Sequence, residues 1–529
     1  MNFVWNVFRS FTRNEKWAAA ASGFAFVASA AGLFIVTVAT RSILIPVAGG
    51  AYREGVVGQP SIVNPLISSS DADEDLAALL FAPLQTLLAS AEQNDDASVY
   101  TLKLKEDLAW DDGAPLTSDD VVFAVETAQD PAAESPFTAA LRGVNAERIS
   151  ALQVKLVLPS PNAFFKETLA RLPIVPAHIW GRIPLKNYHL SEYALAPVGN
   201  GPYRVKSFSK SRDGFIGEYR LVPNPRYAGP APFIEDFRVR FFEDTPALLD
   251  AFRLRKIHGF GFVSPFPEFS EATGGASEVR NPLPRYYAVF INTSANDLLT
   301  DRSFRLALSR AVNRERISSE TFRGGAAPYL PGAAEKQASL AYNPERARDA
   351  LAKAKGSGSG ALVLTVPDIP ALVAAAEIIS SNWRAIGIQN ITIRKVSANR
   401  FGREVLEPRA YELVLAPHVF ANPDDLYPLW HSSSRGAAGQ NFSLYASKKM
   451  DALLERIREI ENPERRGTLA REAESALAED VPAVFLVSLP YVHVHVKALT
   501  GFPETSLAAP ADRFLNVSAW SVARVRVLD

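Results

Sequence analysis

Cysteine is absent from all 529 residues of the chain. Its absence excludes disulfide bonds, thiolate metal sites, a cysteine nucleophile and any lipid anchor attached to cysteine. A protein outside the cytosol can do without disulfides when its core is large enough. The length and the 47% hydrophobic content suit two or three folded domains.

A strong net charge is also missing. The formal net charge is −1 and the pI is about 6.7. No global basic field therefore exists to hold nucleic acid, and we expect no nucleic-acid partner.

Catalytic and nucleotide-binding motifs are scarce. The glycine stretches "GNGP" (199–202) and "GSGSG" (356–360) lack the lysine and Ser/Thr of a phosphate loop. The second stretch formally matches Gly-x-Ser-x-Gly. It joins a helical pattern to a strand pattern, however, whereas a nucleophile elbow runs from strand to helix. Both stretches are interpreted as loops, and the sequence predicts neither an enzyme nor a cofactor.

Two groups of residues could suggest a metal. His493 and His495 in "YVHVHV" share one face of a predicted strand, but no third or fourth ligand is visible, so polar histidines on a strand face are favoured. The acid-rich segment 107–120 lacks the ligand spacing of a calcium loop. A turn at Asp112-Gly113 and a helix cap at Thr117 or Ser118 account for it. No metal site is predicted.

One long apolar run is present, at residues 18–40, without a charged side chain. About 20 apolar residues suffice to cross a bilayer as a helix. Arg9, Arg13 and Lys16 precede the run, which predicts a cytoplasmic N-terminus over 1–16 and a transmembrane anchor over 17–41. The apolar region of a cleavable signal peptide is shorter, roughly 7–15 residues, so an uncleaved single-pass anchor is favoured. The large remainder would then lie on the extracytoplasmic side, periplasmic or outer, of the cell membrane.

The rest of the chain mixes strand and helix patterns. Residues 98–110 alternate as in a strand, and 117–129 open with a cap and two acids as in a helix. Residues 301–317 form an amphipathic helix pattern. These patterns predict a mixed α/β (α+β) fold.

A series of motifs, in chain order, resembles the extracytoplasmic solute-binding proteins of family 5, the peptide- and nickel-type receptors of ABC importers. The most specific is "LAWDDGAPLTSDDVVFAVE" (108–126), which resembles the family pattern W-DG-P-TA-DV-F. The others are "NPL" (64–66), "VGNGPYRV" (198–205), "FINTSANDLLTDRSFRLALSRAVNRERI" (290–317), "NFSLYASKKMDALL" (441–454) and "AEDVPAVFLVSLPYVHV" (478–494). Together they run along residues 52–500.

The resemblance implies a two-lobed periplasmic-binding-protein-like fold with an extra domain, preceded here by one transmembrane helix. Its expected bounds are 52–66, 197–284 and 498–529 for lobe I, 67–196 for the extra domain and 285–497 for lobe II. Hinge strands are expected near Asn292 and Val496, and the lobes would close over a ligand.

The function implied is that of a monomeric membrane-anchored binding protein that captures a solute and delivers it to ABC permease subunits. A short peptide is the favoured solute. The alternatives are a nickel chelate, an oligosaccharide, an opine-like compound, a sensory or structural ectodomain without transport, and an extracytoplasmic hydrolase.

The resemblance also places the ligand-binding residues on two segments. On lobe I they are Ser69, Ser70 and Asp71. On lobe II they are His418, Phe420, Asn422, Asp424, Trp430 and Asn441. Trp430 fits the core as well as a cleft wall, and Asn441 also fits a cap of the "NFS" turn.

The loop "HVFANPDDLYPLWHS" (418–432) departs from the peptide-binding branch. There, a carboxylate a few residues before an Asx-Pro step pairs with the amino group of the ligand. The position three residues before Asn422 holds Val419, and a buried ammonium without a counter-charge is costly. An amino-end contact is therefore not supported at that position. Asp424 could replace it if the loop turns differently, but an Asx-Pro turn explains Asp424 and Asp425 as well.

Overall fold

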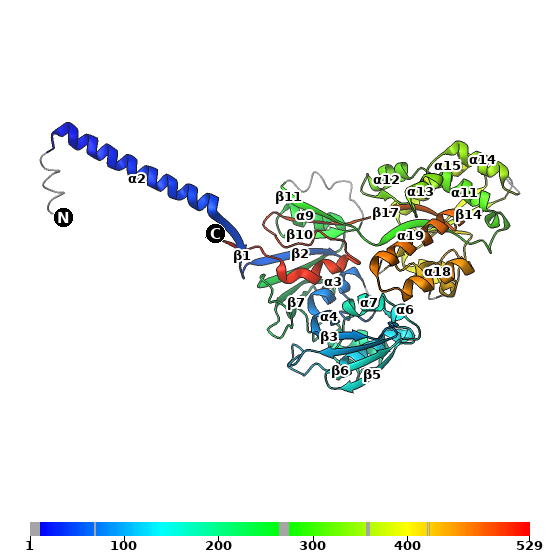
Figure 1. Cartoon of the computed structure of the whole chain (residues 1–529), viewed down its shortest axis with the longest axis horizontal. Coiled ribbons are helices and arrows are strands. Elements are labelled where there is room, and N and C mark those ends of the chain that lie inside the picture. Colours follow the sequence, from blue (N-terminus) through cyan, green and yellow to red (C-terminus); the bar gives the residue numbers. More distant parts are fainter. Residues whose placement is uncertain are drawn as a thin grey trace.

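The computed structural model describes residues 11–67, 70–263, 275–355, 360–420, 422, 424–437 and 439–528. Two lobes, each built on a β-sheet, lie side by side, and the long helix α2 (Arg13–Arg41) projects away from them (Figure 1). The chain therefore has a body and an arm.

Lobe I is built on a seven-stranded mixed sheet with the order β11-β18-β10-β2-β9-β8-β7. Its strands are β2 (Ala51–Val57), β7 (Tyr203–Lys210), β8 (Ile216–Pro223), β9 (Asp236–Phe242), β10 (Gly259–Phe262), β11 (Ala276–Asn281) and β18 (Tyr491–Val496). α9 (Thr245–Arg253) packs beside β2 and β9. β18 pairs with both β10 and β11, so 491–496 lies in the sheet of lobe I, whereas the sequence placed this strand in lobe II.

The extra domain holds the antiparallel sheet β3-β4-β6-β5, formed by β3 (Leu88–Gln93), β4 (Val99–Leu104), β5 (Asn145–Ser150) and β6 (Gln153–Val157). Its helices are α4 (Leu84–Leu87), α5 (Ser118–Gln129), α6 (Thr138–Leu141), α7 (Phe165–Arg171) and α8 (Ala177–Trp180). Thr117 caps α5, as predicted. Trp110 and Trp180 share one hydrophobic core with Tyr52 and Trp520 of lobe I. The extra domain and lobe I are therefore packed as one body.

Lobe II is built on a six-stranded sheet with the order β13-β17-β12-β16-β14-β15. Its strands are β12 (Arg285–Ile291), β13 (Ala327–Pro328), β14 (Leu362–Pro367), β15 (Ile391–Val396), β16 (Leu413–Val419) and β17 (Ala483–Ser488). Val289 and Ile291 of β12 point into one core, and Ala288 and Phe290 point into another. The sheet is therefore covered on both faces, which explains its near-continuous apolar strands.

Helices form both of these covers. One core includes residues of α11 (Arg302–Ala311), α12 (Arg314–Phe322), α14 (Pro344–Lys353) and α15 (Pro370–Ala385). The other includes residues of α17 (Tyr427–Trp430), α18 (Lys448–Glu459) and α19 (Pro463–Asp480). The shorter α13 (Ala334–Leu340) contacts α19, and α16 (Ala398–Phe401) follows β15.

The chain crosses between the lobes in two short steps. Residues 282–284 join β11 to β12, and residues 489–490 join β17 to β18. The predicted hinge near Asn292 and Val496 therefore lies beyond the crossings. The two crossing segments enter the sheet of lobe II side by side, because Tyr287 of β12 pairs with Val487 of β17.

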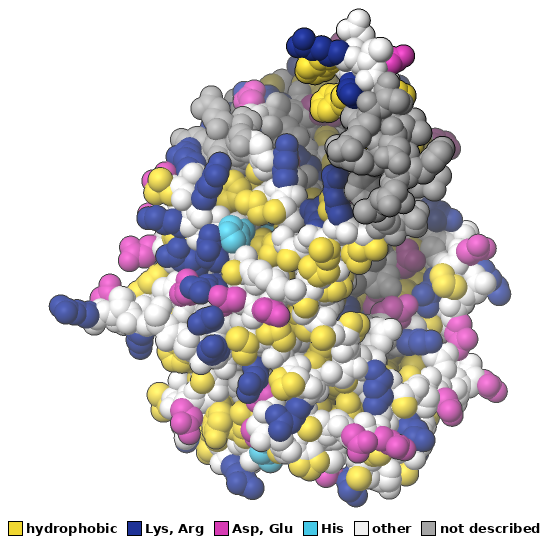
Figure 2. Space-filling model, turned by 90° about the vertical axis from the view of Figure 1, so that its left-hand side faces the viewer, with side chains coloured by type: hydrophobic (Ala, Val, Ile, Leu, Met, Phe, Trp, Pro, Cys, Tyr) yellow, Lys and Arg dark blue, Asp and Glu magenta, His cyan; other side chains and the backbone are white. Residues whose placement is uncertain are grey.

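The arm continues into a two-stranded ribbon. β1 (Ser42–Pro46) follows α2 directly and pairs antiparallel with β19 (Arg524–Leu528). Figure 2 views the molecule from this side. Among the described residues, no helix combines the length and the apolar character that crossing a bilayer requires. The predicted anchor is therefore not confirmed.

A cluster of buried charges joins the segments of lobe I. Arg513 of η7 (Pro510–Ala519) contacts Glu54 of β2 at 3.1 Å and Asp75 of α3 (Asp71–Leu80) at 2.6 Å. The His493 ring lies 3.1 Å from the Glu54 carboxylate. All four side chains are buried.

The charges in this cluster are tightly coupled. Burial alone would raise the pKa of Glu54, but His493 and Arg513 lower it to about 2. Burial raises the pKa of Asp75 to about 6, against the attraction of Arg513. Burial also lowers the pKa of His493, against the attraction of Glu54, and its Nε2–H donates to the Glu54 carboxylate.

Replacement of Arg513 should make lobe I easier to unfold. We expect Arg513→Leu to lower the free energy of unfolding by about 3–5 kcal/mol, because two buried carboxylates lose their counter-charge. Urea unfolding measures it. Arg253→Leu is the control, since Arg253 pairs with Asp250 on the surface and such pairs contribute about 0–1 kcal/mol. Equal losses in the two variants would contradict the role of the buried cluster.

Candidate ligand-binding site

The predicted recognition loop of lobe II leaves the end of β16 beside the start of β12. Register pairs His418 with Tyr286, and Val419 with Arg285. The His418 ring lies 2.8 Å from both the Tyr286 hydroxyl and the Gln440 carbonyl oxygen. A carbonyl only accepts, so Nε2–H donates to Gln440 and Nδ1 accepts the phenol proton. Burial lowers the pKa of His418 to about 3, which keeps this ring neutral.

Aromatic rings enclose His418. The ring of Phe290 lies 4.2 Å from it, and those of Trp430 and Phe442 each lie 5.2 Å from it. His418 and Trp430 are fully buried. Both residues therefore support the loop from inside lobe II, and a direct ligand contact by either stays a prediction.

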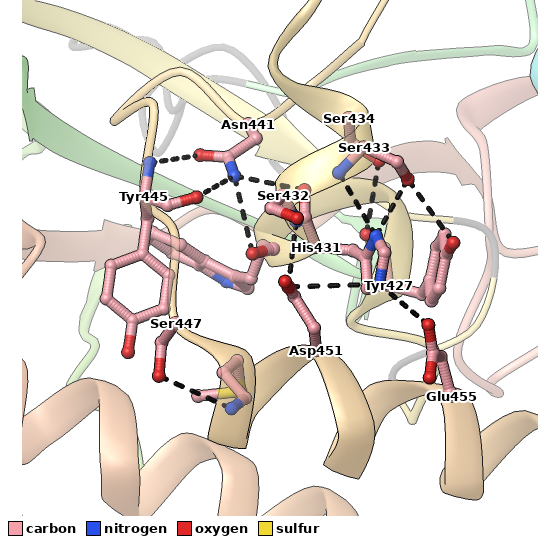
Figure 3. A network of polar contacts seen from close by, with 12 residues as sticks. Tyr427, His431, Ser432, Ser433, Ser434, Asn441, Tyr445, Ser447, Asp451 and Glu455 are labelled. Carbon is pink, nitrogen blue, oxygen red and sulfur yellow. Dashed lines mark hydrogen bonds and ion pairs between the residues drawn. The ribbon is translucent and has the colours of Figure 1, made fainter.

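Asn441 holds the far end of the loop (Figure 3). Its amide group donates to the carbonyls of Trp430, His431 and Tyr445, and its oxygen accepts from the backbone N–H of Tyr445. This side chain is fully buried. Asn441 therefore acts as the backbone cap that the sequence raised as one option.

The same network binds the loop to α18. The backbone N–H of Ser432 donates to Asp451 at 2.9 Å, and the His431 ring lies 3.3 Å from Glu455 and 2.7 Å from the Ser433 hydroxyl. Tyr427 stacks on His431 at 3.9 Å. Residues 427–435 are therefore anchored on a helix of lobe II.

The two adjacent acids have separate environments. Asn422 Oδ1 accepts from the backbone N–H of Asp424 at 2.9 Å, which forms the predicted Asx turn. Asp425 forms a two-pronged ion pair with Arg458, at 3.0 and 2.8 Å. The Arg458 guanidinium also lies 4.0 Å above the Tyr427 ring. Asp425 thus fixes the loop on α18. Asp424 is half-buried, and its carboxylate forms no ion pair among the described residues.

The beginning of the loop is its most accessible part. Val419 is 39% exposed, and Phe420 is half-buried with its ring 6.0 Å from that of Tyr286. The Phe420 N–H donates to the Pro284 carbonyl at 3.0 Å, which ties the loop to the crossing segment 282–284. An exposed valine and a half-buried phenylalanine therefore lie beside the crossing segment.

The predicted residues of lobe I lie at the start of α3. Ser70 caps the helix: its hydroxyl accepts from the Asp73 N–H, and Asp73 accepts from the Ser70 N–H at 3.1 Å. Asp71 is exposed in the first turn. Ser69 lies outside the described residues. Ser70 therefore has a structural task, and a ligand contact by Ser70 or Asp71 stays a prediction.

Arg285 lies near both predicted binding segments, although it was not among the ligand-binding residues predicted from the sequence. Burial lowers the pKa of this guanidinium, and the charges of Asp71 and Glu74 oppose that shift. Burial, with the carboxylates of Asp71 and Asp75, raises the pKa of Glu74 to about 7. Arg285 also pairs with Val419 across the sheet. Arg285 therefore pairs with the start of the loop and feels the charges at the start of α3, and the sequence signal for this was the acid run 71–75.

A second contact between the lobes lies away from the hinge. The Ala163 N–H of the extra domain donates to the Arg458 carbonyl of α18 at 2.7 Å. Phe164 is buried in a core of lobe II, with the Arg466 guanidinium 4.5 Å above its ring. Arg466 also lies 3.3 Å from Glu167. Arg458 thus touches both the extra domain and the recognition loop.

No metal centre emerges from the part of the chain that the structure describes, since no three His, Cys, Asp or Glu side chains gather to hold an ion. His493 and His495 have neighbours of another kind: Glu54 contacts the first, and the second lies 3.0 Å from the Val496 carbonyl. Both histidines are core residues of lobe I.

Comparison with known proteins agrees with this architecture. The family model for bacterial extracellular solute-binding proteins, family 5 Middle, matches residues 83–440. The oligopeptide-binding protein AppA of Bacillus subtilis (strain 168) is 24% identical over 527 residues, covering 92% of this chain and 94% of the relative.

Two solved structures share the fold. The ABC transporter substrate binding protein CtaP from Listeria monocytogenes matches with a TM-score of 0.75 and 22% identity, covering 89% of this chain and 99% of that one. NikZ from Campylobacter jejuni, in complex with Ni(L-His), matches with a TM-score of 0.70, 22% identity and the same coverage. The predicted mixed α/β, two-lobed fold is confirmed.

The neutral His418 predicts an acid-sensitive lobe II. Its pKa is about 3 in the folded chain, so the stability that it contributes is present above about pH 6.5 and falls as the unfolded chain takes up a proton below that pH. Between pH 7 and pH 5, His418→Gln should lose about 2 kcal/mol less unfolding free energy than the parent chain. Urea unfolding at both pH values measures this, and identical losses would contradict it.

The contact at Phe164 predicts that Arg466 keeps the lobes together. We expect Arg466→Ala to favour a more open body by about 1–2 kcal/mol, because the ion pair and the contact with the ring are lost. Small-angle X-ray scattering of the ligand-free chain would show a larger radius of gyration. The neighbouring exposed Arg465 supplies the control, Arg465→Ala. No difference between these variants would contradict the prediction.

Proposed function

Because the chain belongs to family 5 of the bacterial extracellular solute-binding proteins of ABC importers, we propose that it captures a short peptide between its two lobes and delivers it to permease subunits. The proposal rests on the place of Arg285 beside both predicted binding segments: it pairs with Val419 across the sheet, and the charge of Asp71 acts on its guanidinium. A ligand held there would touch the start of α3 on one side and 419–420 on the other, beside the crossings 282–284 and 489–490.

The recognition mode follows from the residues at that point. Val419 carries no charge, so the amino group of a peptide would not be paired at this position. Backbone groups, the Phe420 ring and Arg285 would then provide most of the contact. The relative described as oligopeptide-binding supports a peptide, whereas the relative solved with Ni(L-His) supports a metal chelate. The His418 ring is enclosed, and both of its nitrogens are engaged by Tyr286 and Gln440, so we favour the peptide over a chelate that His418 would ligate.

The arm would keep this receptor at the membrane, and we propose that it acts as a monomer. The uncharged run 18–40 has the length of a membrane span, although no described helix meets the criterion for one. Trp17, Phe24, Phe26 and Leu33 on α2 are each at least 70% exposed, and no part of the body covers this helix in Figure 1. An apolar helix that projects from the body supports a membrane anchor over 17–41, with 1–16 in the cytoplasm.

The test uses peptides with free and acetylated amino ends. Native mass spectrometry of the purified chain should first show a retained peptide. Calorimetric titration should then show that the parent chain binds both peptide forms with similar affinity. Val419→Asp should favour the free amine by roughly 10- to 100-fold, the value of a charge-assisted hydrogen bond, and Val419→Asn is the uncharged control.

Three outcomes would count against the proposal. A retained nickel complex without peptide binding would replace the ligand class. A strong preference of the parent chain for free amines would show that another carboxylate, not a neutral contact at 419, recognises the peptide. Cleaved peptide products would show a hydrolase.

A further inference from the structure

The ribbon of β1 and β19 leaves an aliphatic face uncovered. Register pairs Ile43 with Val527 and Ile45 with Val525, and side chains of directly paired residues share one face of a ribbon. Their exposed fractions are 50%, 41%, 37% and 46%. Four β-branched side chains in contact with solvent indicate a surface that binds something apolar.

The position of this face relative to the arm is fixed by the covalent chain. β1 begins at Ser42, directly after α2 ends at Arg41, so no linker separates them. A five-residue strand is about 17 Å long. When the run 18–40 crosses the hydrocarbon layer, the ribbon therefore starts in the headgroup region.

The other end of the ribbon is fixed to lobe I. The Val47 N–H donates to the Ala523 carbonyl at 3.1 Å, and the Gly49 N–H donates to the Phe233 carbonyl at 2.7 Å. β2 follows at Ala51 and pairs with β9. The ribbon and lobe I therefore form one continuous structure.

Basic side chains lie at the same end of lobe I. β2 and β10 run parallel, so the loop before β10 lies where the ribbon joins β2. There Arg53 donates to the Arg255 carbonyl at 3.2 Å, and Arg240 donates to the Lys256 carbonyl at 3.3 Å. We call Arg53, Arg255 and Lys256 the basic patch; Arg240 is paired with Glu218 at 3.4 Å and is not counted. Figure 2 shows Lys and Arg side chains gathered on the face from which α2 projects.

The ribbon adds two more cations on its second face. Arg524 and Arg526 alternate with Val525 and Val527 along β19, so they point away from the aliphatic face. Arg524 donates to the Ala498 carbonyl at 3.1 Å, a contact that does not neutralise its charge. An aliphatic surface flanked by cations matches the interface of a bilayer that contains anionic lipids.

We propose that the aliphatic face of the ribbon inserts into the membrane interface and that the basic patch, with Arg524 and Arg526, faces anionic phospholipid headgroups. This inference rests on the proposed anchoring by α2, which runs into β1 without a linker. Lobe I then lies against the membrane as a fixed base. Among the described residues, lobe II is joined to it through the hinge and through contacts of the extra domain with α18, α19 and the segment between them, and lobe II is the lobe that moves.

The absence of cysteine allows a direct test, because each introduced cysteine is the only labelling site. The full chain is placed in nanodiscs of phosphatidylcholine with or without phosphatidylglycerol. A fluorophore is attached at Phe26→Cys, Val527→Cys, Arg526→Cys or Ile369→Cys, and nitroxide lipids serve as quenchers. Val527 and Arg526 are matched neighbours on opposite faces, and the exposed Ile369 of lobe II is the distant control.

We expect quenching at Phe26 and at Val527, and weaker quenching at Arg526 and Ile369. The added Arg524→Gln change should lower the docked-to-free ratio at Val527 about fivefold in discs with phosphatidylglycerol, since a basic residue near an anionic surface contributes about 1 kcal/mol. It should have little effect in phosphatidylcholine alone.

The remaining outcomes separate the two proposals. Quenching at Phe26 without excess quenching at Val527 would leave the anchor intact and overturn the inference. No quenching at Phe26 would overturn the anchor and the inference with it. A Val527→Cys disulfide between two copies in place of lipid quenching would assign the face to a second copy and overturn the inference.

Discussion

Arg513, held between Glu54 and Asp75, is the interaction on which lobe I depends. The three side chains come from η7, β2 and α3. Arg513 lies 459 residues from Glu54 and 438 residues from Asp75 in the chain. Burying any one of these charges without its partners would be costly. The three segments must therefore pack against one another for these side chains to leave water. The cluster therefore makes the C-terminal segment part of the same lobe as the first strand. It also fixes α3, whose first turn carries Asp71 at the hinge.

The hinge inherits its geometry from that fixed helix. Arg285 is the first residue of β12 and pairs with Val419 of the loop. Burial lowers the pKa of its guanidinium, and the negative charges of the α3 acids oppose that shift. If the lobes close as the resemblance implies, closure would change the surroundings of this half-buried cation. Arg458 gives a second connection, since its carbonyl binds the extra domain and its guanidinium binds Asp425 of the loop. The loop is thus attached to both places where the lobes touch.

Local features were predictable, and distant pairings were not. The cap at Thr117, the turn at Asp112-Gly113 and the Asx turn at Asn422 depend on neighbours within three residues, which a sequence displays. The place of β18 depends on β10 and β11, more than 200 residues away. The motifs correctly indicated the two-lobed fold, but the strand entered the wrong lobe because alternation does not say which sheet a strand joins. For the same reason no pattern linked Asp425 to Arg458.

The extra domain determines which parts of the molecule pack as one body. Its core is continuous with that of lobe I, so the extra domain and lobe I form one packed body, while lobe II contacts this body at the hinge and around Phe164. A peptide bound near Val419 would lie between these two contacts. Its binding energy would then favour the closed body through both of them, since a ligand shifts a conformational equilibrium only by its differential contacts with the two states.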